Sequence, residues 1–182
     1  MKLMIASDIH GSAYYTRKLL EKMEEEQADK LLLLGDILYH GPRNDFPQEY
    51  CPKEVFPALN AVKDKILCIQ GNCDSEVDQM VLEFPIMVKN MVIEADGVTI
   101  FATHGHEYNI DCLPPLSKGT VMVYGHFHVQ MCEEKDGIIV MNPGSVALPK
   151  DGSFSGYMIA ENGVFTWKDI DGNVRKTYEA VR

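Results

Sequence analysis

Five short apolar stretches of this sequence end in glycine and in side chains that can bind metal ions. The closing residues are aspartate, asparagine and histidine, and they lie in segments 8–10, 35–36, 71–72, 104–105 and 125–126. In open sheets with parallel strands, ligands bind outside the carboxyl ends of the strands. Five such ends can therefore place their polar side chains around one crevice, which predicts a single functional site.

Two of these segments carry polar residues at alternate positions. Asp8 and His10 form one pair, and His126 and His128 form the other. Alternate residues at the end of a strand point to the same side of the sheet. Each pair is therefore suited to bind one ion.

The hydrophobic periodicity predicts different architectures for the two halves of the chain. The first half is expected to form strands at 2–6, 31–34 and 65–70 and helices at 14–26, capped by Ser12, and at 52–62. In the second half, short β-prone stretches flank the pairs Asp96-Gly97, Asp136-Gly137, Asn162-Gly163 and Asp171-Gly172, as in two-residue hairpin turns. We expect a β-α-β-α-β unit followed by antiparallel strands, within a single domain over residues 1–182.

Charge and cysteine content exclude several classes of protein. The 17 basic and 27 acidic side chains give a net charge of −10, which disfavours binding of extended nucleic acids. No apolar run approaches the roughly 18 residues of a membrane span, and the first one stops at Asp8, too early for a signal peptide. The five cysteines lack C-x-x-C spacing and are expected to be reduced thiols. These features predict a cytoplasmic protein without membrane contact.

The polar segments also match a known order of motifs. D-x-H, G-D, G-N-x-D, T-H-G-H and G-H-x-H begin at residues 8, 35, 71, 103 and 125. This order resembles that of the calcineurin-like metallophosphoesterases. Segments 40–44, 72–80 and 142–145 resemble in particular the small bacterial phosphodiesterases of the YfcE-like group. The resemblance implies an α/β fold, a four-layer αββα sandwich of two mixed β-sheets flanked by helices.

The resemblance further implies a centre of two divalent metal ions. One ion would be bound by Asp8, His10 and His128, the other by Asn72, His104 and His126, and Asp36 would bridge them. Two octahedral ions take about twelve ligands, so roughly four positions would remain for a hydroxide and substrate oxygens. Imidazole, carboxylate and amide ligands favour Mn²⁺, with Fe, Ni or Zn as alternatives.

The implied activity is phosphodiester hydrolysis, in which a metal-bridging hydroxide attacks phosphorus. Cys73 stands where most of the superfamily has the histidine that helps to protonate the leaving oxygen. Without that acid, the site should favour diesters or activated leaving groups over alkyl monoesters. His106 or His40 could partly replace it, and a thiolate ligand role for Cys73 is an alternative. Asp74 either orients a neighbouring imidazole or caps a turn.

Residues of the long loop 39–52 are candidates for substrate binding. Arg43 and Asn44 could hold the second ester arm or a phosphate oxygen, although Arg43 could equally be a solvated surface residue, and His40 could contact phosphate. The expected partner is a small-molecule phosphodiester, and assembly into a homo-oligomer is compatible with the sequence. Two other functions stay open: a phosphomonoesterase or nucleotidase with the same site, and a non-catalytic binding module similar to the scaffold subunit of retromer.

Overall fold

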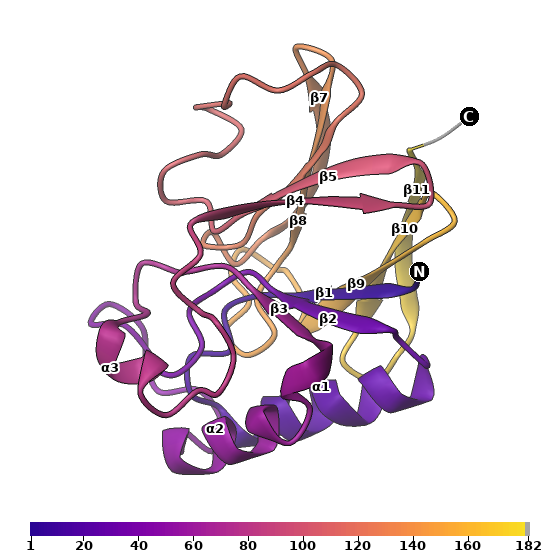
Figure 1. The fold of residues 1–182 in the computed structure, drawn as a ribbon. Coiled ribbons are helices and arrows are strands. Elements are labelled where there is room, and N and C mark those ends of the chain that lie inside the picture. Colours follow the sequence, from indigo (N-terminus) through magenta and orange to yellow (C-terminus); the bar gives the residue numbers. More distant parts are fainter. Residues whose placement is uncertain (181–182) are drawn as a thin grey trace.

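The computed structural model describes residues 1–180, in which two β-sheets pack face to face and helices cover the outer face of the first sheet (Figure 1). The six-stranded sheet has the order β11-β10-β9-β1-β2-β3, formed by β1 (Leu3–Ala6), β2 (Lys30–Leu33), β3 (Ile66–Cys68), β9 (Gly156–Glu161), β10 (Val164–Asp169) and β11 (Val174–Glu179). The five-stranded sheet has the order β4-β5-β6-β8-β7, formed by β4 (Asn90–Ala95), β5 (Val98–Thr103), β6 (Val121–Val123), β7 (Gln130–Lys135) and β8 (Ile138–Pro143). Both sheets combine parallel and antiparallel pairs, so the prediction of an α/β fold with two mixed sheets is confirmed.

The first half of the chain forms the predicted β-α-β-α-β unit. Strands β1, β2 and β3 are parallel neighbours, and the connections between them contain α1 (Ala13–Glu25), α2 (Pro52–Asn60) and a 3-10 turn (Lys63–Lys65). A one-turn helix, α3 (Glu76–Gln79), follows β3. Ser12 caps α1 as predicted, because its Oγ accepts a hydrogen bond of 3.2 Å from the Tyr15 N–H. The unit therefore places three carboxyl ends at one edge of the sheet.

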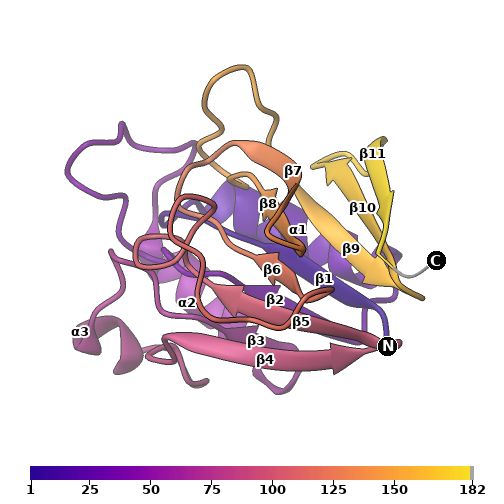
Figure 2. The same cartoon turned by 90° about the horizontal axis from the view of Figure 1, so that it is seen from above.

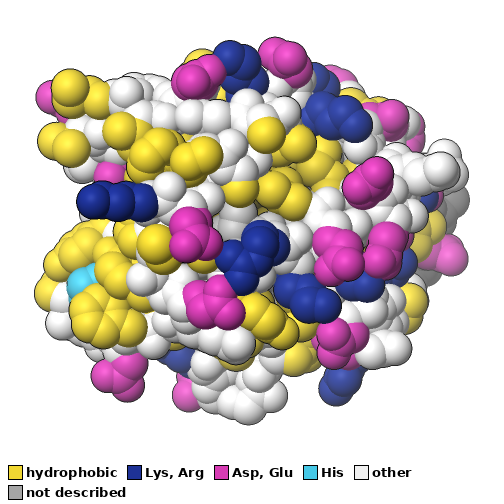
Figure 3. Space-filling model, turned by 90° about the horizontal axis from the view of Figure 1, so that it is seen from below, with side chains coloured by type: hydrophobic (Ala, Val, Ile, Leu, Met, Phe, Trp, Pro, Cys, Tyr) yellow, Lys and Arg dark blue, Asp and Glu magenta, His cyan; other side chains and the backbone are white. Residues whose placement is uncertain are grey.

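Strand β1 shows how the core is divided between the layers. Met4 and Ala6 pack with residues of α1 and α2, whereas Leu3 and Ile5 pack with residues of the second sheet. All four are buried, as expected for a central strand whose side chains alternate between two covered faces. The core that the two sheets share supports the proposal of a single domain. The solvent-facing side of the molecule seen from below carries interspersed basic and acidic side chains (Figure 3).

The outer face of the second sheet lacks the helical layer expected for a four-layer sandwich. Within residues 1–180, segment 104–120 covers this face and contains no helix, and the view from above shows α1 and α2 beneath the sheets (Figure 2). The segment packs against the sheet through Tyr108, Ile110, Leu113 and Leu116. Pro114, Pro115 and Gly119 oppose a helix here, since proline lacks the N–H donor and glycine is conformationally costly to order.

Three of the four predicted hairpin turns have two residues. The turns at 96–97, 136–137 and 162–163 have both residues at positive φ, which the type I′ turn requires. The fourth differs, since four residues connect β10 to β11. The Asp169 carboxylate stabilises this longer loop by accepting hydrogen bonds from the Asp171 and Asn173 N–H groups, at 3.2 and 2.9 Å.

Candidate metal centre

The polar residues that follow five strands come together at one side of the molecule. Asp8 and His10 follow β1, Asp36 follows β2, Asn72 follows β3, His104 follows β5, and His126 and His128 follow β6. In the first sheet β1, β2 and β3 are parallel, and in the second sheet β5 and β6 are parallel. The packing of the two sheets brings their strand ends to the same place, as the sequence predicts.

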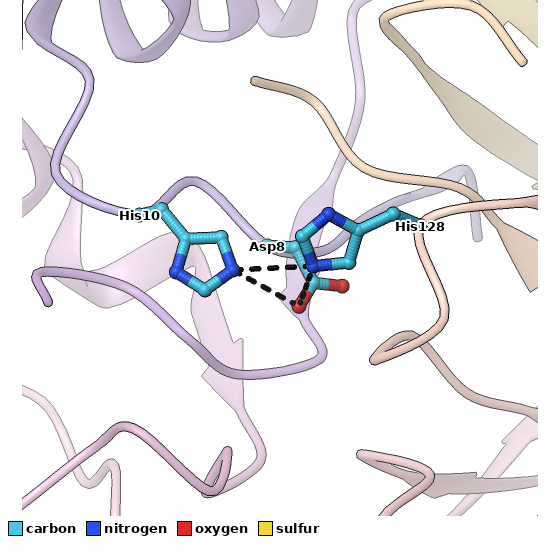
Figure 4. Close-up of side chains that lie close together, drawn as sticks. All are labelled: Asp8, His10 and His128. Atoms are coloured by element: carbon cyan, nitrogen blue, oxygen red, sulfur yellow. Dashed lines mark hydrogen bonds and ion pairs between the residues drawn. The ribbon is translucent and has the colours of Figure 1, made fainter. Parts of the chain in front are cut away.

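Asp8, His10 and His128 form a buried cluster (Figure 4). The Nε2 atoms of His10 and His128 are 3.2 Å apart, and Asp8 Oδ1 lies 3.6 Å from His10 Nε2 and 3.3 Å from His128 Nε2. The opposite ring atoms, His10 Nδ1 and His128 Nδ1, lie 2.8 and 2.6 Å from the carbonyl oxygens of Tyr39 and Leu148. Because a carbonyl can only accept, each Nδ1 carries the proton and each Nε2 lone pair points into the cluster.

This cluster is suited to a cation in its donor atoms and in its electrostatics. Asp8 Oδ1 is buried and makes no hydrogen bond with the described residues. Burial opposes the charge of Asp8, yet the neighbouring His10 and His128 hold the pKa of this carboxyl well below its usual range. Burial likewise opposes protonation of His10, but Asp8 and Asp36 outweigh it and raise its pKa. A site that favours a proton on this imidazole also favours a metal ion on the same lone pair.

Asp36, Asn72 and His104 form a second cluster beside the first. His104 Nε2 lies 3.0 Å from Asn72 Oδ1 and 3.5 Å from Asp36 Oδ1, and His104 Nδ1 donates to the Leu34 carbonyl at 2.6 Å. The other oxygen of Asp36, Oδ2, lies 3.7 Å from His10 Nε2 in the first cluster. The Asp36 carboxylate therefore stands between the two clusters with one oxygen toward each.

His126 completes the set of predicted ligands. Its ring centroid is 5.1 Å from that of His104, and its backbone N–H donates to Asp8 Oδ2 at 2.9 Å. Burial and the neighbouring His104 lower the pKa of His126 to about 4. The imidazole is therefore neutral at pH 7, which is the form that binds metals.

The backbone around these residues is held in an uncommon conformation. Five of the predicted ligands have φ between 50° and 64°, namely Asp8, His10, Asp36, His126 and His128. Residues other than glycine rarely adopt this region, at a cost of about 1 kcal/mol or more each. Two neighbouring glycines permit close approach, since a Cβ at Gly71 would collide with the Asp36 carboxylate and one at Gly125 with Ser7 and Asp8. Such strain concentrates at functional sites.

Asp74 does not orient an imidazole, and the alternative interpretation of a turn-capping carboxylate is the one the geometry supports. Its oxygens accept three backbone N–H groups, from Asp36 at 2.8 Å, Ile37 at 2.8 Å and Gly71 at 2.7 Å. Burial, which outweighs these hydrogen bonds, raises the pKa of Asp74 to about 6. The side chain links the turns after β2 and β3, and so positions Asp36 relative to Asn72.

Segment 142–148, in the second half of the chain, forms hydrogen bonds with the turns that carry the predicted ligands. Asn142 Nδ2 donates to the Gly125 carbonyl at 2.7 Å, and Ser145 Oγ donates to the Asp8 carbonyl at 2.7 Å. The Leu148 carbonyl accepts from His128, as described above. The sequence singles out residues 142–145 by their resemblance to the YfcE-like group. In the structure, segment 142–148 connects the two turns that carry Asp8 and the pair His126 and His128.

A cavity of about 430 Å³ has several of the predicted metal ligands in its wall. It is lined by Asp36, Gly41, Pro42, Arg43, Asn44, Asn72, Cys73, His126, Phe127, His128 and Lys150. The predicted substrate residues Arg43 and Asn44 are thus at the cavity. Phe127 and Lys150 were missed by the sequence analysis. Phe127 stands between two predicted ligands in sequence, a signal that could have identified it, whereas nothing in the sequence marks Lys150.

Of the three remaining candidate residues, Cys73 lines the cavity, whereas His106 and His40 do not. Burial, reinforced by Asp36, raises the pKa of Cys73 to about 12, so its thiol is protonated at neutral pH when no cation is bound. Its Sγ lies within 4.8 Å of ligand atoms of His10 and Asp36, so the thiolate ligand stays an alternative. His106 is exposed with its ring centroid 5.4 Å from that of His104, although it does not line the cavity. The ring of His40 packs among Tyr39, Phe46 and Tyr50, with centroids 4.6 to 5.2 Å away. His40 does not line the cavity either, which disfavours its role as a phosphate ligand.

Comparison with known proteins places this site in a family. The model of the calcineurin-like phosphoesterase superfamily domain matches residues 1–162. Phosphodiesterase YfcE of Escherichia coli (strain K12) is 45% identical over 166 residues, which cover 91% of this chain and 90% of YfcE. The solved structure of the E. coli phosphoesterase Yfce matches with a TM-score of 0.96 at 41% identity, covering all of both chains.

More distant proteins share the fold. Phosphodiesterase MJ0936 of Methanocaldococcus jannaschii is 30% identical over 151 residues, which cover 79% of this chain and 83% of MJ0936. Vps29 of Entamoeba histolytica, solved in complex with Zn²⁺, is 17% identical with a TM-score of 0.62 over the full length of both chains. The family match over most of the sequence and the close relative agree with the clustered aspartates and histidines. This chain therefore belongs to the calcineurin-like phosphoesterase superfamily.

Proposed function

We propose that this protein is a phosphodiesterase that uses divalent metal ions to hydrolyse small-molecule phosphodiesters. The observation that carries the proposal is the position of Asp36, whose two carboxylate oxygens face two separate clusters of metal-binding side chains. An open cavity adjoins this carboxylate and offers room for a substrate. The relatives named phosphodiesterases support the same reaction class.

The donor atoms fit two divalent ions. Asp8, His10 and His128 would hold one ion, Asn72, His104 and His126 would hold the other, and Asp36 would hold both. We propose Mn²⁺ as the native metal, with Fe, Ni or Zn as alternatives, because the donors are imidazole, carboxylate and amide groups. When bound, the ions would supply Lewis acidity and would activate water as the nucleophile.

The chain's own groups position the proposed ligands and could donate a proton or a hydrogen bond to a substrate oxygen. Backbone carbonyls fix three imidazoles, and Asp74 fixes the turn of Asp36. His106 lies outside the cavity lining, with its ring centroid 5.4 Å from that of His104, and is exposed, so a substrate that extends past His104 could accept a hydrogen bond from its ring. Cys73 offers a neutral thiol in place of an acidic imidazole. This arrangement favours substrates whose leaving oxygen needs little protonation.

The preference for diesters can be measured directly. Mn²⁺-reconstituted protein should hydrolyse bis-p-nitrophenyl phosphate with a kcat/KM at least about tenfold higher than that for p-nitrophenyl phosphate. This is the preference expected if the chain shares the reaction class of the relatives named phosphodiesterases. The reverse preference would support the phosphomonoesterase or nucleotidase alternative. Inertness toward both esters with every divalent ion would leave the non-catalytic binding module as the better hypothesis.

Restoring an imidazole at position 73 should broaden the activity. Cys73→His places a proton donor at the cavity wall beside Asn72, and general acid catalysis contributes about a hundredfold or more to reactions with poor leaving groups. We expect at least a roughly tenfold rise in phosphate release from glycerol 2-phosphate. Cys112→His, at an exposed cysteine outside the cavity lining, is the matched control. Equal rates in both variants would show that Cys73 does not limit monoester hydrolysis.

Of membrane association, location and assembly, the described part of the chain bears on the first. None of the helices within residues 1–180 is long and apolar enough to cross a membrane. A cytoplasmic location stays a prediction from the sequence. Assembly into a homo-oligomer also stays a prediction, which sedimentation velocity of the purified protein would test.

A further inference from the structure

The cavity extends beyond the metal-binding residues and has basic walls. Arg43 lies on one of its loops and Lys150 on another. Neither side chain makes a hydrogen bond or an ion pair with any residue in the described range 1–180. Among the lining residues only Asp36 is acidic, and its two oxygens face the metal clusters. The chain as a whole carries a net charge of −10, so two basic side chains without an acidic partner at one cavity differ from the overall excess of acidic residues.

The backbones that carry both cations are tied to the metal-binding turns. The Lys150 N–H donates to the carbonyl of His128 at 3.0 Å. Within the loop that carries Arg43, Asn44 Nδ2 donates to the His40 carbonyl at 2.8 Å. Gly41 has φ of +79°, and a Cβ there would approach Cys73 Sγ to 3.3 Å, so this loop packs closely against the turn of Asn72. The backbones of both basic residues are therefore held beside the proposed reacting centre, while their side chains are exposed at the cavity.

The net charge of the proposed metal centre indicates which substrates Arg43 and Lys150 would favour. Two divalent ions carry four positive charges, from which Asp8, Asp36 and a hydroxide would remove three, and the neutral imidazoles remove none. The remaining charge of about +1 already balances a phosphodiester, which carries a single negative charge. Arg43 and Lys150 add two positive charges that a simple diester would leave unmatched, and unmatched cations near a binding site favour a more anionic ligand.

Resting on the phosphodiesterase function proposed above, we propose that Arg43 and Lys150 bind a second phosphate carried by one ester arm of the substrate. Phe127, which is 46% exposed and lines the same cavity, offers a ring face on which a planar group of that arm can stack. The substrate class is therefore nucleotide-like diesters with a further phosphate. Hydrolysis forms a bond from a water oxygen to the scissile phosphorus and breaks the bond to the leaving oxygen, which takes a proton, while the second phosphate is unchanged.

Two esters with the same leaving group isolate this interaction. The p-nitrophenyl ester of thymidine 5′-phosphate and its 3′-phosphorylated derivative differ only in the second phosphate, so the ratio of their kcat/KM values reports its recognition. In the Mn²⁺-loaded wild-type protein we expect the 3′-phosphate to raise kcat/KM about tenfold at low ionic strength, mainly through KM, because charge-assisted hydrogen bonds to phosphate are strong. The ratio should fall at high salt, since exposed charges are screened.

Variants identify the residues responsible. Arg43→Gln and Lys150→Met should each lower the ratio about threefold, and the double variant should bring it close to one. Both side chains are exposed, so the variants should fold. Lys53→Met, at an exposed lysine of α2 outside the cavity lining, is the matched control and should keep the wild-type ratio. A wild-type ratio near one, or a double variant with the wild-type ratio, would overturn the proposal.

A binding measurement separates this proposal from the catalytic one. Calorimetry on the Mn²⁺-loaded protein should show that thymidine 3′,5′-bisphosphate binds about tenfold more tightly than thymidine 5′-phosphate, and that the double variant loses the difference. If neither aryl ester is hydrolysed but this difference is present, the phosphodiesterase function fails and the second phosphate site stands. If the esters are hydrolysed and the two nucleotides bind equally, the enzyme function stands and the second phosphate site is wrong.

Discussion

Replacement of Asp36 by asparagine should reduce kcat/KM for bis-p-nitrophenyl phosphate by at least about a thousandfold, equivalent to roughly 4 kcal/mol of transition-state stabilisation. The substitution keeps the size of the side chain and leaves Oδ1 able to accept the hydrogen bond of 2.8 Å from the Cys73 N–H. It removes the negative charge and one of the two oxygens that face the metal clusters. The affinity for both ions should fall together, because this carboxylate is the group that the two clusters share.

Metal content gives a second measurement for the same variant. After reconstitution with Mn²⁺ and dialysis, elemental analysis of the wild-type protein should find about two ions per chain, and Asp36→Asn should retain fewer than one. Asp45→Asn, at an exposed aspartate of the same loop, controls for the loss of one charge and should behave as the wild type. A variant that keeps full turnover and both ions would refute the bridging role of Asp36.

Removal of the metal ions should abolish hydrolysis and lower the thermal stability of the protein. Chelation leaves two imidazole lone pairs facing each other at 3.2 Å beside the buried Asp8 oxygen that lacks a hydrogen bond. Ligands that bind only the folded state stabilise it by about 2.7 kcal/mol at a hundredfold excess over Kd. For a chain of this length each kcal/mol shifts Tm by about 2–4 °C. We therefore expect Mn²⁺ to raise Tm by about 5–10 °C.

Calcium provides the control for this experiment. Ca²⁺ prefers oxygen ligands, whereas the two clusters contain four imidazoles, so it should restore neither activity nor the full increase in Tm. Differential scanning calorimetry and hydrolysis of bis-p-nitrophenyl phosphate measure the two effects in parallel. Persistent activity in chelated protein with no bound metal would refute a metal-dependent mechanism. The absence of any Tm shift with Mn, Fe, Ni or Zn would refute the proposed donor set.

The sequence by itself determined the elements of the first half and the convergence of the polar strand ends, and its resemblance to a known family supplied the proposed set of metal ligands. Apolar runs that stop at a glycine and a polar residue define strand ends locally, and the pairs at positions 8 and 10 and at 126 and 128 follow from the spacing alone. Because the carboxyl ends of parallel strands share one edge, convergence of these side chains could be predicted without coordinates.

Only the tertiary structure decided how the groups between these motifs are used. Asp74 caps backbone N–H groups, and His40 packs among aromatic rings, because contacts between separate turns depend on side-chain directions that a local pattern does not specify. The non-helical cover of the second sheet and the basic walls of the cavity belong to aperiodic loops, whose path is set by packing. The resemblance already implies a bridging role for Asp36. The tertiary structure adds the distances from its two oxygens to His10 and His104, which depend on the packing of two sheets formed by residues far apart in the chain.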